Sequence, residues 1–275
     1  MRGEAGIAHA MMSTAELHAL CRRIGAQVAL DPKGLRSTIA LGEDAIDDAL
    51  PSRGLETGAV HEVLPASHRD FGAAFGFGVG VLARLTRADP RPVLWVSPSQ
   101  GFRYGITYPI GCASYGLDPD RLHHLSVASP QDMLWALEEG LANGALAAAV
   151  GLLPANDASY DFTASRRLSL RATATRTTAL LIRHHASIDT PTAAVTRWSI
   201  ASRSSPPLKR EGLSMPGIGP PCWQADLVRC KRGQPRSWLV EWDHEAFRFR
   251  LASAMADRAS AMAKPPIGRH WQMAS

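Results

Sequence analysis

Short runs of apolar residues alternate with longer, helix-like segments through most of the chain. The short runs are bounded by turn residues, and we expect buried strands at 59–64, 92–96, 122–127, 145–153 and 178–182. The segments between them have the length or the period of helices, which we expect at 71–87, 104–115, 129–141 and 161–175. Buried strands that alternate with helices are typical of parallel strand–helix–strand units. The predicted fold class is therefore α/β, with a mostly parallel central sheet flanked by helices.

Capping residues indicate where two of the helices begin. Ser129 is a good N-cap, Pro130 suits the first helical position, and Asp132 completes a capping pair. Near the start of the chain, the spacing of Ser13 and Glu16 matches a capping box and predicts a helix over 13–26.

The pattern changes after about residue 193. Strand-like segments separated by turns follow, at 194–202, 223–230 and 237–242, with a Pro/Gly/Ser-rich stretch at 204–221. A helix is expected from about Glu245 to Asp257, and a loose tail over 263–275. We therefore divide the chain into three parts: an N-terminal helix and linker (1–37), one main domain (38–245) and a C-terminal helix and tail (246–275).

The composition narrows the class of protein. Of the 275 residues, 45% are hydrophobic and 20% charged, which excludes disordered, collagen-like and coiled-coil chains. The longest charge-free apolar run, Phe71–Ala83, is shorter than the roughly 20 residues that a membrane span needs. The N-terminus has no sustained apolar stretch of the secretory kind. The four cysteines are widely spaced, as in reduced proteins, so we expect a cytoplasmic location without membrane contact.

Basic residues and tryptophans are interleaved between residues 197 and 237. This region has eight basic side chains against two acidic ones, and Trp198, Trp223 and Trp238 lie among them. Such a mixture suits a phosphate backbone with exposed bases. It equally describes a solvated basic face with the tryptophans in the core, because strands place alternate residues on opposite faces. We prefer the second interpretation, and retain three residues as candidate contacts to DNA or a partner: Lys231, Arg232 and Arg236.

Residues for nucleotide chemistry are missing where they would be expected. The phosphate loop G-x-x-x-x-G-K-[ST] does not occur. The first strand–loop–helix unit reads LPASHRDF over 64–71, without glycine, and Asp70 stands where a lysine would be. The glycines of 76–80 fall inside a predicted helix, where they favour close packing against a sheet rather than dinucleotide binding.

Other reactive residues do not assemble into a site. Ser67, His68 and Asp70 are neighbours in one loop, whereas catalytic triads are assembled by fold geometry. Carboxylates and a histidine cluster at 241–245, but no second cluster completes a metal site. We therefore predict no catalytic residue, no metal and no cofactor, and a protein that is not an enzyme.

The stretch Leu50–Val63 (LPSRGLETGAVHEV) resembles the segment that leads into the phosphate loop of RecA-like recombinases. More closely, it resembles the ImuA family, the RecA-related proteins of bacterial damage-induced mutagenesis cassettes. Further matching motifs follow in order: Leu117–Leu122, Trp135–Glu139, Asp161–Leu168, Leu180–Arg183, Trp223–Arg229 and Trp238–Trp242. The resemblance covers about residues 38 to 245.

This resemblance implies a RecA-like core and a role as an accessory factor in error-prone translesion synthesis during the SOS response to DNA damage. The partners it implies are an ImuB-like, polymerase-related protein without catalytic residues, an error-prone DNA polymerase and RecA.

The nucleotide-handling residues of the recombinases are absent from all four corresponding positions. They are the loop at 64–72, the catalytic glutamate expected after 92–96, the aspartate expected after 145–150 and the glutamine expected after 178–182. The DNA-binding loops of the recombinases correspond to 153–160 and 183–193. Within them, the candidate contacts to DNA or a partner are Arg183, His184 and His185.

We thus predict a non-catalytic RecA-like protein that recruits components of a mutagenic polymerase complex. Three alternatives stay open: a SulA-like cell-division inhibitor that binds FtsZ, an ATPase with an unorthodox phosphate loop, and a DNA-binding module.

Overall fold

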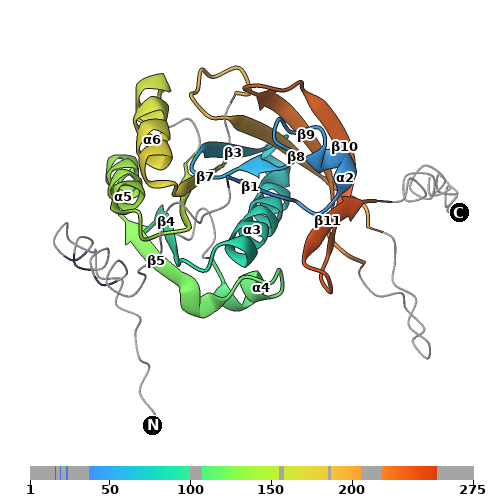
Figure 1. Ribbon diagram of the computed structural model, residues 1–275, viewed down its shortest axis with the longest axis horizontal. Helices are drawn as coiled ribbons and strands as arrows, with labels where there is room; N and C mark the ends of the chain where they lie inside the picture. Colours follow the sequence, from blue (N-terminus) through green and yellow to red (C-terminus); the bar gives the residue numbers. More distant parts are fainter. Residues whose placement is uncertain are drawn as a thin grey trace, which may run out of the picture.

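The structure of the protein is a computed structural model, which describes residues 37–99, 107–154, 158–184, 187–205 and 219–252, together with Glu16, Ala19 and Arg23. Within these residues the main element is a nine-stranded sheet, in the order β11-β10-β9-β8-β3-β7-β6-β4-β5 (Figure 1). The mixed α/β fold predicted from the sequence is confirmed.

Six neighbouring strands run parallel: β3 (Val60–Pro65), β4 (Val93–Pro98), β5 (Leu122–Val127), β6 (Ala148–Leu153), β7 (Thr178–Arg183) and β8 (Thr196–Arg203). Three antiparallel strands extend the sheet: β9 (Cys222–Cys230), β10 (Arg236–Asp243) and β11 (Arg248–Leu251). A separate small sheet pairs β1 (Thr38–Ile39) with β2 (Leu55–Glu56). The predicted strands of the parallel part are thus all present.

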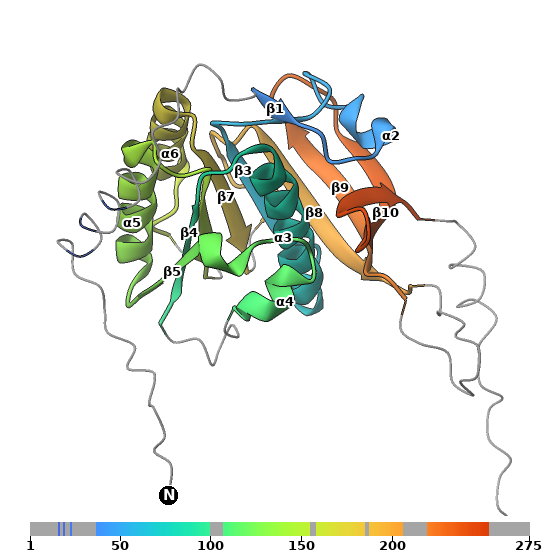
Figure 2. The same cartoon turned by 60° about the horizontal axis from the view of Figure 1, so that its bottom comes forward.

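Helices cover both faces of the parallel strands. They are α2 (Asp44–Asp47), α3 (Phe71–Ala88), α4 (Pro109–Ala113), α5 (Pro130–Asn143) and α6 (Phe162–Thr175), with 3-10 turns η2 (His68–Asp70) and η4 (Pro119–Arg121). Helices α5 and α6 lie side by side on one face, and α3 lies on the other (Figures 1 and 2). Each face has its own apolar core, since alternate strand residues point to opposite sides.

Helix α3 is apolar around most of its circumference because the antiparallel strands also pack against it. The ring of Phe77 lies 6.0 Å from Trp223 of β9 and 4.9 Å from Phe249 of β11, centroid to centroid. A Cβ added to Gly80 would lie 2.9 Å from the Phe249 ring, so glycine allows this close approach. The predicted packing role of the helix glycines is confirmed.

The N-cap predicted at Ser129 is used as expected, whereas the cap predicted at Ser13 lies outside the described residues. The Ser129 hydroxyl accepts a hydrogen bond of 3.1 Å from the Asp132 backbone N–H at the start of α5. The Asp161 carboxylate does the same for Ala164, at 2.7 Å, at the start of α6. Both helices therefore begin where a side chain satisfies an orphan backbone donor.

A helix was predicted from about Glu245 to Asp257. This prediction is wrong for the described part, which ends at Ala252. Residues 248–251 form β11, which pairs with β10, so the sheet continues past the boundary placed at 245. The reason is that burial alternates from one residue to the next, as it does in a strand. Phe249 is buried, whereas Arg248 and Arg250 on either side are exposed. Three predictions fall wholly or mostly outside the described residues. They are the part of this helix beyond residue 252, the helix at 13–26 and the Pro/Gly/Ser-rich stretch.

Candidate functional site

The loop after β3 occupies the place where a phosphate loop would lie. It leads from the carboxyl end of β3 through η2 into α3. The backbone N–H of Ala66 donates to the carbonyl of Ile200, at 2.8 Å, so the loop is tied to the neighbouring strand β8. The sheet therefore helps to fix the conformation of this loop.

Asp70 fixes a negative charge at the start of α3. Its carboxylate accepts hydrogen bonds from the Ser67 hydroxyl (2.6 Å) and from both the backbone N–H and the hydroxyl of Ser202 (2.8 Å each). Burial by itself raises the pKa of Asp70, but these hydrogen bonds outweigh it and leave the pKa below its ordinary value. A helix start favours anions, and here that position already faces a carboxylate of the chain itself.

Aromatic rings pack beside Asp70, above the ends of β3 and β7. The Phe71 ring lies 4.4 Å from the His184 ring, and His68 lies 5.2 Å from His184, centroid to centroid. Phe75 continues the cluster and reaches Trp95 on β4 at 5.5 Å. We call His68, Phe71, Phe75, Trp95 and His184 the ring cluster. Neither the lysine nor the glycines of a phosphate loop are present here, as the sequence predicted.

A buried ion pair lies on the opposite face of β3. The Glu62 carboxylate contacts the Arg197 guanidinium at 2.6 Å, and both side chains are almost fully buried. Glu62 also accepts hydrogen bonds from the hydroxyls of Tyr160 (2.7 Å) and Thr192 (2.6 Å). Burial and the adjacent Glu62 carboxylate raise the pKa of Tyr160 well above its ordinary value, so this phenol stays a hydrogen-bond donor.

The Glu62 carboxylate thereby holds two connecting segments at once. Tyr160 belongs to the segment between β6 and α6, and Thr192 to the segment between β7 and β8. Arg197 reinforces the second segment by donating to the carbonyls of Ile188 and Thr190, each at 2.7 Å. These are the segments that the sequence resemblance equates with the DNA-binding loops of the recombinases. Their described parts are fastened to the core of this protein.

Sequence reasoning did not identify this ion pair. It placed Arg197 within the basic region, and it treated Glu62 as part of an ordinary strand. A signal was available: a carboxylate inside a strand buried on both faces needs a partner, because a lone buried charge is very costly. The partner itself lies 135 positions along the chain and follows no local pattern.

The Leu50–Val63 motif lies at the edge of the sheet where the parallel strands begin. His61 is buried, and its ring nitrogens contact the Thr196 hydroxyl (2.8 Å) and the Glu56 carbonyl (2.7 Å). Trp198 donates to the same Thr196 hydroxyl at 3.1 Å. The consistent arrangement is a chain of donors from Trp198 through Thr196 and His61 to Glu56. Burial lowers the pKa of His61 to about 4, so its ring is neutral near pH 7.

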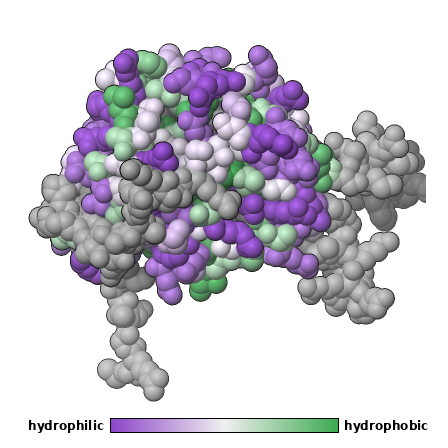
Figure 3. All heavy atoms as spheres, viewed as in Figure 1, coloured by the Kyte–Doolittle hydropathy of each residue, from purple (hydrophilic) through white to green (hydrophobic). Residues whose placement is uncertain are grey.

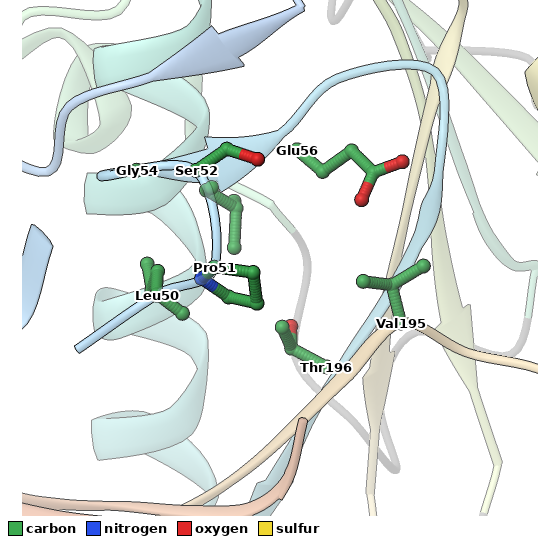
Figure 4. A pocket seen from close by; sticks show the side chains of 8 residues that line it. Leu50, Pro51, Ser52, Gly54, Glu56, Val195 and Thr196 are labelled. Carbon is green, nitrogen blue, oxygen red and sulfur yellow. The ribbon is translucent and has the colours of Figure 1, made fainter. Parts of the chain in front are cut away.

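A very small hollow lies beside this chain of hydrogen bonds. Its volume of about 10 Å³ is near the minimum for a single water molecule. Figure 4 shows it between the 50–56 segment, which contributes Pro51 and Glu56, and Val195 and Thr196 of the neighbouring strand region. The motif that carries the family resemblance thus forms packing and hydrogen bonds around this small space. Four of its residues, Ser52, Glu56, Thr57 and Gly58, also line a larger polar hollow of about 300 Å³.

The structure places the candidate contact residues in two separate groups. Arg183 and His184 lie at the carboxyl ends of the parallel strands, after β7. Lys231, Arg232 and Arg236 lie in the β9–β10 connection and at the start of β10, near the amino ends, because Cys230 pairs with Thr196. His185 lies outside the described residues. A single ligand contacting both groups would have to reach across the sheet.

Arg183 and His184 are buried. The guanidinium of Arg183 lies over the Tyr160 ring, 5.2 Å from its centroid, and His184 belongs to the ring cluster. Both therefore contribute to the interior around the connecting segments. Whether either residue also contacts DNA or a partner stays a prediction.

Lys231, Arg232 and Arg236 are exposed, and each has different surroundings. Arg232 pairs with Glu56 at 2.5 Å and lines a polar hollow of about 300 Å³. Lys231 lines a second hollow of about 330 Å³ beside α6. The tryptophans of this region lie inward: Trp198 and Trp223 are buried, and Trp238 packs against Trp198. The preferred interpretation, tryptophans in the core, is confirmed for the first two.

The described residues contain no group of three or more histidines, cysteines, aspartates or glutamates arranged to hold a metal ion. Nor does any helix within the described ranges combine the length and the apolar character needed to cross a membrane.

No protein-family model matches the chain. The chain is similar to the curated Protein ImuA of two strains of Caulobacter vibrioides, NA1000 / CB15N and ATCC 19089 / CIP 103742 / CB 15. It is 30% identical to each over 240 residues, which cover 82% of this chain and 93% of the relative. The chain belongs to the ImuA family. The resemblance seen in the sequence motifs is thereby confirmed at the level of the family, and the match extends well beyond those motifs to nearly the whole length of the two relatives.

Proposed function

We propose that this member of the ImuA family is a non-catalytic, RecA-like accessory factor in error-prone translesion DNA synthesis. It acts in the SOS response by recruiting partners into a mutagenic polymerase complex. The expected partners are an ImuB-like polymerase-related protein, an error-prone DNA polymerase and RecA. Membership of the ImuA family supports the link to damage-induced mutagenesis.

The loop after β3 is the observation that carries the non-catalytic part of this proposal. A bound triphosphate needs backbone N–H groups and a lysine around its phosphates. Here the Asp70 carboxylate is held at the start of α3 by Ser67 and Ser202, and the ring cluster packs beside it. A triphosphate at this position would meet a fixed negative charge of the same sign.

The anchored connecting segments favour recruitment of proteins over DNA binding at the carboxyl edge of the sheet. Loops that close on DNA must be able to move, and local opening requires few buried contacts. In this protein Tyr160 and Thr192 share one buried carboxylate, and Arg197 holds the backbone of Ile188. The described parts of these segments are therefore suited to presenting a fixed surface.

Calorimetric titration of the full chain with ATP and magnesium tests the non-catalytic part. RecA titrated in the same buffer provides the positive control. We expect no saturable heat for this protein at millimolar ATP. Saturable binding in the micromolar range, or turnover that disappears on changing the loop at 64–72, would contradict the proposal.

Affinity capture tests the recruiting part. Tagged full-length protein is mixed separately with purified RecA and with the ImuB-like protein encoded in the same genome. We expect capture of at least one of the two. If neither is captured, the recruiting function is wrong. Deleting the gene should also lower the frequency of mutations induced by ultraviolet light, and an unchanged frequency would argue against a role in mutagenesis.

A further inference from the structure

A groove on the outer flank of the molecule combines exposed apolar side chains with positive charge. It lies between α6, the segment that precedes β8 and the end of β9, and its volume is about 330 Å³. We call it the α6 groove. The lining residues that matter here are Phe162, Arg166, Leu170, Ala193, Arg229 and Lys231.

The apolar part of the groove comes mainly from one side of α6. Phe162, Arg166 and Leu170 are four residues apart, so their side chains follow one stripe of the helix. Phe162 is 48% exposed and Leu170 is 63% exposed. Only six large hydrophobic side chains are exposed in the described part of the chain, and two of them lie in this groove. Grouped exposed apolar residues mark binding surfaces more often than single ones do.

The surface around this stripe is otherwise mainly polar. On the face shown in Figure 3, hydrophilic side chains predominate and hydrophobic ones form small, separate patches. A pair of large apolar side chains lining one concave surface is therefore a local feature, and general surface hydrophobicity does not account for it.

The charge of the groove has one sign. Arg166, Arg229 and Lys231 line it, and no acidic residue does. Two other arginines of α6, Arg167 and Arg171, contact Glu138 of α5 at 2.9 and 3.6 Å and so are partly neutralised on the other side of the helix. Within the described residues, no carboxylate forms an ion pair with the three cations of the groove.

We propose that the α6 groove binds an acidic peptide segment of a partner protein. One or two bulky apolar side chains of that segment pack between Phe162 and Leu170, and its carboxylates face Arg166, Arg229 and Lys231. This inference rests on the proposed recruiting function and assigns a surface to it. The groove contains Lys231, which the sequence had singled out, and leaves out Arg232 and Arg236.

The shape of the groove favours a peptide over a nucleic-acid strand. A single strand needs cations along successive phosphates and several aromatic side chains for its bases. Here three cations surround one concave surface, Phe162 is the aromatic residue in its lining, and Leu170 and Ala193 are aliphatic. Such a surface suits an apolar anchor with acidic neighbours, in which charge complementarity also accelerates association.

The test uses the full chain and the purified partner captured under the proposed function. One variant replaces the apolar anchor site, Leu170→Asp, and a second reverses the charge, Arg229→Glu with Lys231→Glu. Matched controls place the same changes outside the groove, as Ile110→Asp and as Arg87→Glu with Arg203→Glu. All changed side chains are exposed, so circular dichroism should show unchanged folding.

We expect both groove variants to bind the partner at least tenfold more weakly, and both controls to stay within twofold of the unchanged protein. Raising the salt from 50 to 300 mM NaCl should weaken binding by the unchanged protein more than by the charge-reversed variant. Among overlapping 15-residue peptides of the partner, the bound ones should be acidic and contain bulky apolar residues.

The outcomes separate the two proposals. If the unchanged protein captures the partner and the groove variants do so equally well, the groove assignment is wrong and the recruiting function stands. If no partner is captured by any form, the recruiting function fails and the groove assignment fails with it. If the groove variants lose binding to a 20-nucleotide oligo-dT but keep the partner, the groove binds nucleic acid and the peptide assignment is overturned.

Discussion

Glu62 on β3 and Arg197 on β8 form an ion pair of 2.6 Å in the interior, although 135 positions separate them in the chain. Both side chains are almost fully buried, and the carboxylate also accepts from Tyr160 and Thr192. The pair links strands β3 and β8. Through Tyr160 and Thr192 it also links them to the segments between β6 and α6 and between β7 and β8. The ion pair therefore contributes to holding both connecting segments in place.

Replacing Arg197 with methionine should be strongly destabilising. It leaves the Glu62 carboxylate buried without its cation, which typically costs about 3–5 kcal/mol in the free energy of unfolding. The double variant Glu62→Gln with Arg197→Met removes both charges and should recover part of that loss. Urea denaturation of the three proteins measures the difference. A single variant within about 1 kcal/mol of the unchanged protein would show that the pair does not stabilise the fold.

His61 should make the stability of the protein fall with acid. Its pKa is lowered from 6.5 to about 4 in the folded state, so between these values the unfolded chain binds a proton that the folded protein does not. Stability should therefore decline as the pH falls from about 6.5 to 4, by about 3 kcal/mol from this residue. His61→Gln should remove that component, whereas His124→Gln, an exposed control, should retain it. Parallel pH profiles for the unchanged protein and His61→Gln would contradict the assignment.

Asp70 should show a pH dependence that also weakens the fold in acid. Its folded-state pKa lies below the ordinary value, so its contribution is present above the unfolded pKa and is lost as the pH falls through the folded pKa. Asp70→Asn should cost about 1–3 kcal/mol near pH 7, because the charged acceptor for Ser67 and Ser202 is lost. The difference from the unchanged protein should shrink below pH 4 in denaturation experiments. A difference that is constant with pH would show that the charge is irrelevant.

Two glycines allow a matched test of backbone conformation. Gly58 has φ +65°, and an added Cβ would lie 2.9 Å from the Cα of Arg176, so Gly58→Ala should cost about 1–3 kcal/mol. Gly72, in the first turn of α3, has nothing within 4 Å of an added Cβ. Gly72→Ala should be neutral or stabilising by up to about 1 kcal/mol. Equal effects of the two substitutions on the thermal midpoint would refute the argument.

The parallel part of the fold was predictable because its signals are local. Strands such as Ala148–Leu153 are continuous apolar runs, α3 is too long to be a strand, and Ser129 with Pro130 marks the start of α5. Strand β11 was missed because its alternation of arginine with apolar residues extends over only four residues, the lower limit at which alternation indicates a strand.

The candidate site was less predictable because it depends on distant contacts. The absence of phosphate-loop residues could be seen from the sequence, but the tie between Asp70 and Ser202 crosses 132 positions. The basic residues of 197–237 also differ in a way that local alternation does not reveal: Arg197 is buried against Glu62, whereas Lys231 is exposed. Likewise, Phe162 and Leu170 looked like ordinary helix residues until α6 was placed beside β9.

Under the proposed function, the ring cluster makes the loss of nucleotide binding hard to reverse by evolution. Restoring glycines and a lysine to the loop would not empty the space beside α3, because His68, Phe71 and His184 would still pack there. Removing Asp70 first would take away the side-chain tie between the loop and Ser202 of β8 before any phosphate could take its place. Each single substitution toward a phosphate loop should therefore lower stability before it adds affinity for a nucleotide, so we expect descendants of this protein to diversify at their surfaces.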